Sequence, residues 1–380
     1  MENEIDGESG PLSHSKNGAG KNEPKMQKSI TKQREQAKFK QLDVDFRALP
    51  ADDMRKRAWV NVDKFSTTWV TAWPDPIGHL TNAELMEIST FYFGLPSPAC
   101  HSFVGQQIGS SRDVVDRYGC KLTTAVLPGD GWRTQHDALK WCLTDDLKYA
   151  QVRSTTEVYG LFAPLLPQRA RKELGGLPLR QRQGLLPYFM IYCTDEKQIE
   201  HPTLFELKTL HFGSSTYANN AKRCAAVQTR ARRVHQEYVT KARKLDADYW
   251  DAEDGSDGPV LCKLRSFGFV RGLAFGAWGE ASEATEDLLH LIAHAAARAH
   301  WRKMNCRDEA KAVGAFAWSV RRRWPMSALR ENARLKIDRL AFVGPGAAAA
   351  ACRRRQGEAD HTSRARVFEA FDLFGTRFGR

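Results

Sequence analysis

The order of the elements that the sequence predicts indicates an α/β or α+β fold. Residues 184–193 and 203–210 are short apolar runs with aromatic and β-branched side chains, and a polar, turn-prone stretch separates them. This pattern predicts an antiparallel hairpin. Helical periodicity on both sides of the hairpin, and a further apolar run later in the chain, predict a mixed sheet core flanked by helices.

The helix before the hairpin is expected from about Thr134. Its apolar positions recur at helical spacing and form one stripe that faces a core. These positions are Leu139, Cys142, Leu143 and Leu147.

After the hairpin, residues 221–245 show a second helical pattern, with Val227, Val234, Tyr238 and Ala242 on one face. Residues 268–278 read as another strand. Ser282 is placed as the N-cap of the next helix, because acidic residues follow it in the first turns. Ser327 is placed as the cap of a basic helix that ends near Phe342.

Composition divides the chain into five parts. The first is rich in Gly, Ser, Asn, Lys and Glu and is expected to be a disordered tail. The others are a loop-rich segment, the core, a basic helical region and a low-complexity extension. The five parts cover residues 1–40, 41–132, 133–300, 301–343 and 344–380.

The net charge of the chain is +12, and most of it lies near the C-terminus. Residues 298–380 hold 19 Lys and Arg against 8 Asp and Glu, which gives +11. Such asymmetry favours a polyanionic partner, with nucleic acid first among the candidates. The alternative is a solvated basic surface without a partner.

No apolar run is long enough for a transmembrane helix, and residues 1–40 lack the apolar segment of a secretory signal. We therefore expect a nuclear or cytoplasmic protein that is neither secreted nor membrane-bound. The eight cysteines then read as reduced thiols. Whether Cys100, His101, Cys120 or His136 bind zinc is open, because no pair of cysteines has the close spacing of a zinc knuckle.

Glu206 and Lys208 are the strongest candidates for chemistry. In a strand, residues i and i+2 share a face, so a carboxylate and an ammonium group project together from an apolar strand. One interpretation is a structural ion pair. The other is a metal ligand beside a cation that stabilises negative charge as it develops.

The motif Glu206-Leu207-Lys208 on the second hairpin strand, after Pro187 on the first, resembles the PD-(D/E)XK nuclease pattern. Glu157 occupies the place of the upstream acid of that pattern. The segment Gln135-His136-Asp137-Ala138-Leu139-Lys140, preceded by a Cys/His-containing stretch, extends the similarity to the restriction-like endonuclease of certain non-LTR retrotransposons. The similarity covers about residues 90–300.

The resemblance implies Mg²⁺ as cofactor. It implies Glu157 and Glu206 as metal ligands, and Glu157, Glu206 and Lys208 as the catalytic residues, with the lysine assisting the attacking water. The hairpin position of the family's aspartate is Tyr188 in this chain. A phenol with a pKa of about 10 is a poor Mg²⁺ ligand. Asp195 is the next candidate for the third carboxylate.

The helix after the hairpin is locally basic, and its cations are candidates for contacts with a phosphate backbone. The alternative is a solvated helix face. The candidate residues are Lys222, Arg223, Arg230, Arg232, Arg233 and Lys241.

Together these features predict a mobile-element-derived, endonuclease-like protein with a nucleic acid as partner, DNA first among the candidates. Hydrolysis of DNA phosphodiesters with Mg²⁺ is expected to be weak or absent because of Tyr188. The alternative is a nucleic-acid-binding protein without catalytic activity that retains the nuclease-like fold. DNA or RNA preference, target sequence and oligomeric state do not follow from the sequence.

Overall fold

The structure is a computed structural model, and it forms two compact units, Met1–Pro50 and Ala51–Arg380. The described residues are 23–71, 79–109, 111–127, 131–158, 161–176, 187–194, 200–213, 217, 224–250 and 257–344. The predicted extension 344–380 and the polar stretch around Asp195 lie almost wholly outside this range.

The first unit contributes one described helix, α1 (Glu23–Ala48). Residues 1–40 were expected from their composition to form a disordered tail, and within them the described helix α1 begins at Glu23. The segment is poor in apolar residues, but its many Lys, Gln, Glu and Ala residues have high helix propensity. Low hydrophobicity therefore excluded a core in this segment without excluding a helix.

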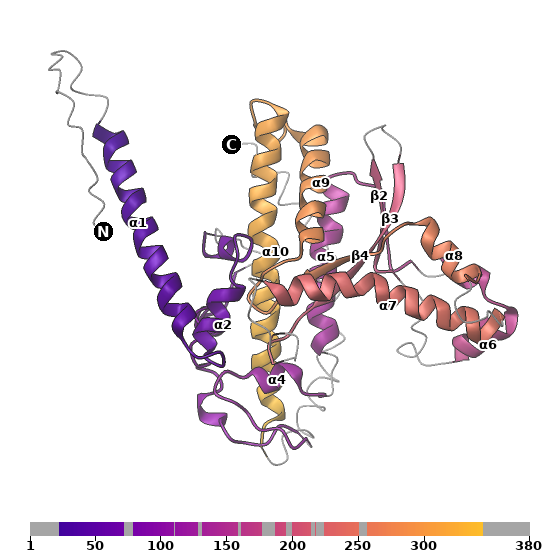
Figure 1. The fold of residues 1–380 in the computed structure, drawn as a ribbon, viewed down its shortest axis with the longest axis horizontal. Coiled ribbons are helices and arrows are strands. Elements are labelled where there is room, and N and C mark those ends of the chain that lie inside the picture. The colour runs from indigo at the N-terminus through magenta and orange to yellow at the C-terminus, as the bar shows by residue number, and fades with distance from the viewer. Residues whose placement is uncertain are drawn as a thin grey trace, which may run out of the picture. The chain divides into compact units, whose positions relative to one another are not determined.

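The second unit is built from helices and one small sheet (Figure 1). Before the sheet hairpin, the chain forms α2 (Met54–Asn61), η1 (Ser66–Thr71), α3 (Asn82–Tyr92), η2 (His101–Phe103), α4 (Cys120–Thr124), α5 (Gly131–Tyr149), β1 (Ser154–Thr156), η3 (Ala163–Leu165) and α6 (Gln168–Gly176). From the hairpin onward it forms β2 (Phe189–Thr194), β3 (Glu200–Thr209), α7 (Ala225–Trp250), α8 (Pro259–Ser266), β4 (Arg271–Phe275), α9 (Glu283–His300), α10 (Glu309–Arg339) and η5 (Leu340–Phe342).

The sheet has the strand order β1-β2-β3-β4. The pairs β1–β2 and β2–β3 are antiparallel, and β3–β4 is parallel. The predicted hairpin is therefore confirmed as β2–β3, and the predicted mixed sheet flanked by helices is confirmed as an α+β architecture. The chain passes from β3 to its parallel neighbour β4 through α7 and α8, as a parallel connection requires.

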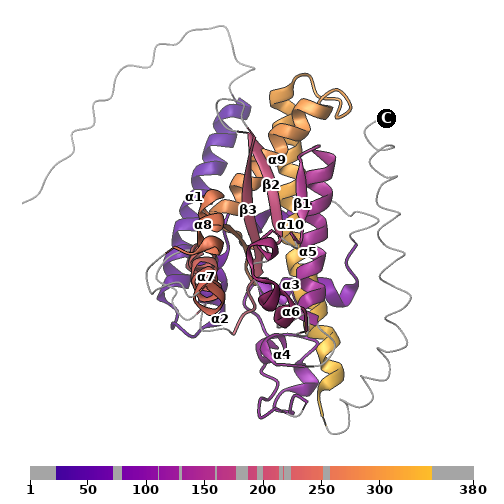
Figure 2. The same cartoon turned by 90° about the vertical axis from the view of Figure 1, so that its right-hand side faces the viewer.

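Helices cover both faces of the sheet (Figure 2). Phe205 and Leu207 of β3 point into the cluster that α5, α9 and α10 complete. Leu204 points into the opposite cluster, which α6, α7 and α8 complete. The alternation follows from the period of two in a strand, so even-numbered residues of β3 face α7.

The contact between α7 and β4 is close because β4 carries glycine at its centre. A Cβ atom on Gly272 would lie 2.6 Å from the Cα of Ala231, which is closer than carbon atoms approach without displacement of the backbone. The close contact allows α7 to reach β3, the strand next to β4.

The basic C-terminal region is part of the same core as the sheet. The helix α10 runs from Glu309 to Arg339 with Pro325 and Ser327 inside it, so the placement of Ser327 as an N-cap was wrong. The true N-cap is Asp308, whose carboxylate accepts a hydrogen bond from the backbone N–H of Lys311. By contrast, Ser282 is the N-cap of α9, as expected.

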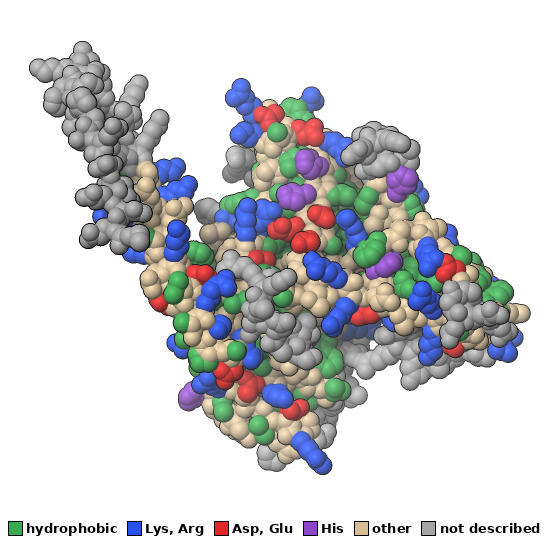
Figure 3. Space-filling model, viewed as in Figure 1, with side chains coloured by type: hydrophobic (Ala, Val, Ile, Leu, Met, Phe, Trp, Pro, Cys, Tyr) green, Lys and Arg blue, Asp and Glu red, His purple; other side chains and the backbone are tan. Residues whose placement is uncertain are grey.

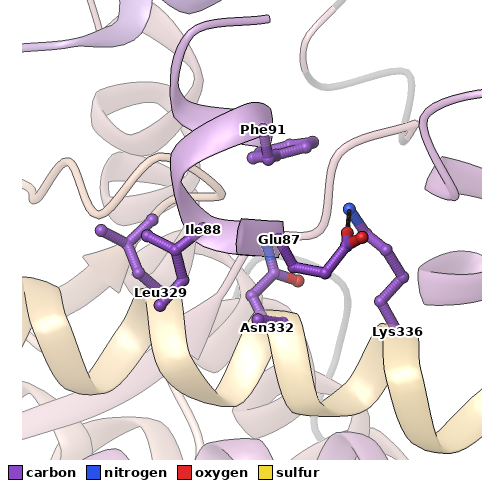
Figure 4. Close-up of a pocket in the computed structure, with 7 residues that line it drawn as sticks. Glu87, Ile88, Phe91, Leu329, Asn332 and Lys336 are labelled. Atoms are coloured by element: carbon purple, nitrogen blue, oxygen red, sulfur yellow. Dashed lines mark hydrogen bonds and ion pairs between the residues drawn. The ribbon is translucent and has the colours of Figure 1, made fainter. Parts of the chain in front are cut away.

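Several cations of α10 point inward and anchor it. Arg339 is buried and donates to the carbonyl oxygens of Leu122, Thr123 and Ala125 at the end of α4. Lys336 forms an ion pair with Glu87 of α3, with 3.1 Å between Nζ and Oε2 (Figure 4). These charges hold the helix in place, so the basic residues of α10 do not all belong to a solvated surface.

The Glu87–Lys336 pair lines a cavity of about 10 Å³ between α3 and α10, room for about one water molecule. The other oxygen of Glu87 accepts hydrogen bonds from the Ser97 hydroxyl and the Ala99 N–H. Both charges are therefore satisfied from within the protein, and removal of one partner would cost about 3–5 kcal/mol.

Glu280 lies in the segment between β4 and α9, and its carboxyl group is fully buried. The Tyr217 hydroxyl donates to its Oε1 at 2.6 Å and the Trp278 N–H donates to its Oε2 at 2.9 Å. Burial raises the pKa of Glu280 to about 8, and the two hydrogen bonds offset this only in part. The folded protein therefore holds a proton on Glu280 that the unfolded chain, with a pKa near 4.5, gives up more readily.

The raised pKa of Glu280 predicts a pH dependence of stability. The contribution of the proton is complete below about pH 4.5, falls as the pH rises, and is lost above about pH 8. Glu280→Gln mimics the neutral form, so its thermal midpoint should rise relative to that of the natural protein between about pH 5 and pH 9. A constant difference between the two midpoints across this range would contradict the assignment.

Candidate functional site

The register of the first three strands places Glu157, Tyr188 and Glu206 in one row. Phe189 of β2 pairs with Thr156 of β1 and with Phe205 of β3. Tyr188 precedes Phe189, whereas Glu157 and Glu206 follow Thr156 and Phe205, so these three residues form the next row of the antiparallel register. The backbone continues the row, because the Glu157 N–H donates to the Tyr188 carbonyl at 2.8 Å. Directly opposed residues have Cβ atoms about 4.5–5.5 Å apart, so Tyr188 lies between the two acids.

The phenol of Tyr188 is held neutral by this position. Burial raises its pKa to about 12, and the carboxylates of Glu206, Asp137 and Glu157 contribute in the same direction. The candidate site therefore consists of the row of Glu157, Tyr188 and Glu206, with Asp137 next to His136, whose ring contacts Tyr188.

Glu206 is the most buried of the three acids, with 5% of its surface exposed. Its Oε1 accepts a hydrogen bond from the Nζ of Lys208 at 2.6 Å, and its Oε2 accepts one from the Tyr238 hydroxyl at 2.8 Å. Tyr238 belongs to α7, which reaches Glu206 because of the close packing on Gly272. Both oxygens of Glu206 thus have a donor.

Glu157 comes directly after β1 and has a φ of +50°, which is uncommon for a residue with a side chain. Its Oε1 accepts a hydrogen bond from the Nζ of Lys140 at 2.7 Å. Lys140 lies on α5 and is almost fully buried. Backbone strain of this kind persists only where the surrounding structure holds it, and it is frequent at functional sites.

Asp137 completes the group of acids, from the turn of α5 that precedes Lys140. The Nζ of Lys140 lies 3.2 Å from Asp137, and the Nδ1 of His136 lies 3.6 Å from it. Burial opposes ionisation of Asp137, but the contacts with His136 and Lys140 outweigh it and lower the pKa of Asp137 to about 2. The His136 ring in turn contacts the ring of Tyr188 at a tilt of 45°, with 4.3 Å between the ring centroids.

Of these residues, the sequence singled out Glu157, Glu206 and Lys208 as catalytic. The structure places Glu157 and Glu206 in the same row as Tyr188, and it bonds Lys208 to Glu206. The sequence missed the roles of Asp137, Lys140 and Tyr238 in the same group. Asp137 and Lys140 are three positions apart on a helix and so share a face, a signal that the sequence contained. The reach of Tyr238 to Glu206 had no such signal, because it depends on the packing of α7 against the sheet.

The arrangement does not fit a magnesium ion as it stands. Mg²⁺ is held by carboxylate oxygens that are free to coordinate it, whereas Lys140 and Lys208 already bond Glu157 and Glu206. Within the described part of the chain, no group of three His, Cys, Asp or Glu side chains is arranged to hold a metal ion. An ion would first have to displace the two ammonium groups.

The residues considered for zinc do not all gather in one place. Cys100 and Cys120 are buried near each other, His101 is exposed, and His136 lies on α5 in contact with Tyr188. Burial raises the pKa of both thiols.

The basic helix is α7, and its predicted nucleic-acid contacts have different surroundings. Arg232, Arg233 and Lys241 are exposed. Arg230 is half-buried and forms an ion pair with Glu237, with 2.8 Å between Nη1 and Oε1. Lys222 and Arg223 lie outside the described residues.

Comparison of the chain with protein families, with curated proteins and with solved structures finds no match. Among the described helices, none is both long and apolar enough to cross a membrane. The assignment of a function therefore rests on the residues and their geometry.

The bond between Glu206 and Tyr238 predicts a measurable coupling. Glu206→Ala leaves the buried Tyr238 hydroxyl without this acceptor, which should cost about 1–3 kcal/mol of unfolding free energy. Tyr238→Phe should cost about 1 kcal/mol, and the double variant should be more stable than the sum predicts by about 0.5–3 kcal/mol. Urea denaturation measures all three, with the exposed Lys241→Ala as a control within about 0.5 kcal/mol of the natural protein. Additive losses would show that the two side chains do not interact.

Proposed function

We propose that the chain is a nucleic-acid-binding protein on an endonuclease-like core of the PD-(D/E)XK kind, related to the nuclease of non-LTR retrotransposons, and that it cleaves its ligand poorly or not at all. One observation carries the proposal. Glu157, Tyr188 and Glu206 occupy one row across three strands, with Lys208 two residues after Glu206. The resemblance requires this constellation, with a phenol in the place of the second acid.

The surroundings of the acids favour binding over hydrolysis. Lys140 and Lys208 offset two of the three carboxylate charges of Glu157, Asp137 and Glu206, which leaves less negative charge with which to attract a metal ion. The neutral Tyr188 adds none. Without a metal ion, the acids have nothing with which to lower the pKa of a water molecule or to stabilise charge on a phosphate.

The exposed cations of α7 are suited to bind a phosphate backbone. At 100° per residue, Arg233 and Lys241 lie on the flank of α7 that also carries Arg230, and Arg232 lies on the other flank. Lys and Arg side chains are spread over the part of the surface around α7 and α8, with scattered acidic ones among them (Figure 3). Contacts with phosphates carry no sequence information, so little sequence preference is expected.

Hydrolysis of DNA phosphodiesters is the second candidate function. The strained backbone of Glu157 favours it, because strain is retained at sites where geometry matters for chemistry. The third carboxylate in that case is Asp137 of α5, which raises the pKa of Tyr188 together with Glu206 and Glu157. Asp195, the candidate from the sequence, lies outside the described residues.

The proposal predicts binding that weakens steeply with salt. The affinity for DNA should fall by about 0.9 in log K per unit of log salt concentration for each phosphate that a cation neutralises. Replacement of Arg232, Arg233 and Lys241 by alanine should lower the affinity and flatten this slope. Fluorescence anisotropy with a labelled duplex at several salt concentrations measures both quantities.

A matched control removes three exposed cations elsewhere. Lys303, Arg307 and Lys311 lie around the start of α10 and are also exposed, so their replacement changes the net charge by the same amount. This variant should keep the slope of the natural protein. Equal losses in both variants would contradict the placement on α7, and an affinity that does not depend on salt would contradict the proposed function itself.

A further inference from the structure

Phe269 is an aromatic side chain in the turn before β4, and 58% of its surface is exposed. One face of its ring stacks on His235 of α7, with 4.0 Å between the ring centroids and 22° between the planes. Phe269 follows Gly268, which has a φ of +72° that a residue with a Cβ rarely adopts. The turn thus presents an aromatic ring with one face supported and the rest toward solvent.

The supporting ring of His235 is fixed in place. Its Nδ1 accepts a hydrogen bond from the backbone N–H of Val270 at 3.2 Å. An Nδ1 that accepts cannot carry a proton, so the ring is the neutral form with its proton on Nε2. Burial lowers the pKa of His235, which agrees with this form. The two stacked rings therefore form a rigid pair, which we call the Phe269 platform.

Exposed cations lie on the elements that carry the platform and next to it in the chain. Arg232 is exposed and lies three residues before His235, so both are on one side of α7. On α8, the Nζ of exposed Lys263 lies 5.0 Å from the centroid of the Phe267 ring, two residues before Phe269. Arg271 is also exposed, although Asp287 offsets its charge at 3.6 Å.

The platform is close to the carboxylate row. Glu206 pairs with Gly272 in the parallel register of β3 and β4, and Phe269 comes three residues before Gly272. At about 3.3 Å per residue, the two lie roughly 10 Å apart along the sheet. A single strand of nucleic acid spans this distance with two nucleotides.

We propose that the Phe269 platform binds an unpaired base of a single nucleic-acid strand, with the base stacked on the open face of Phe269 and the neighbouring phosphates near Arg232 and Lys263. The proposal rests on the proposed function and names its ligand. A planar base matches the ring in shape, and the cations match the phosphates in charge. The bases of an intact duplex are stacked on each other, so a duplex would not use the platform.

The test compares Phe269→Leu, Phe269→Tyr and the natural protein in binding to oligothymidylate that carries one 2-aminopurine. Stacking contributes about 1–3 kcal/mol per base, so Phe269→Leu should lower the affinity roughly 5- to 150-fold, and Phe269→Tyr should restore it. The salt slope should stay constant in both variants, because neither change removes a cation. Quenching of 2-aminopurine fluorescence should be present in the natural protein and the Tyr variant and lost in the Leu variant. Circular dichroism checks that the variants fold.

The outcomes separate this proposal from the proposed function. Duplex binding should be the same for all three proteins. If Phe269→Leu keeps its full affinity for the single strand and its quenching, the platform proposal is overturned while nucleic-acid binding stands. If the natural protein binds neither the single strand nor the duplex, the proposed function itself is overturned.

Discussion

The pairing register of the central hairpin is the constraint on which the site depends. Because side chains alternate along a strand, a shift of one residue between β2 and β3 would turn Glu206 into the apolar cluster and Leu207 toward α7. Phe205 and Leu207 resist this shift, since they fill the core that α5, α9 and α10 enclose. The packing of Phe205 and Leu207 in the core thus fixes the face of the sheet from which Glu206, the residue between them, projects.

The second constraint is the balance of charge around that row. The acids near Tyr188 would repel each other if they lacked partners, and the buried Lys140 of α5 and the half-buried Lys208 of β3 supply these partners. The same two lysines bond oxygens that a metal ion would otherwise coordinate. Under the proposed function, this charge balance and the phenol of Tyr188 together account for weak hydrolysis.

The sequence predicted secondary-structure elements and the residues that share a face within them, but it missed contacts between elements that are far apart in the chain. The strand β3 and the E-x-K pair follow from the period of two, and α7 follows from its apolar stripe. The strand β1 has only three residues and no periodicity to detect, so the sequence found Glu157 through a resemblance alone. Ser327 was misplaced because serine is a favoured N-cap residue, whereas here it lies inside α10, as does the buried Pro325. Lys336 and Arg339 point inward toward acceptors on α3 and α4. These acceptors are far away in the sequence, so the pattern around α10 gave no sign of them.

The plasmid-nicking rate of the natural protein with Mg²⁺, beside Tyr188→Asp and the double variant Tyr188→Asp with Glu206→Ala, tests the central claim most directly. The account predicts no nicking above background for the natural protein, because Tyr188 is neutral and the acids are bonded to lysines. It predicts Mg²⁺ binding by Tyr188→Asp, seen by calorimetry, and its loss in the double variant. Robust nicking by the natural protein that Glu206→Ala abolishes would contradict the account, because it would show that the acids bind a metal ion despite their lysine partners.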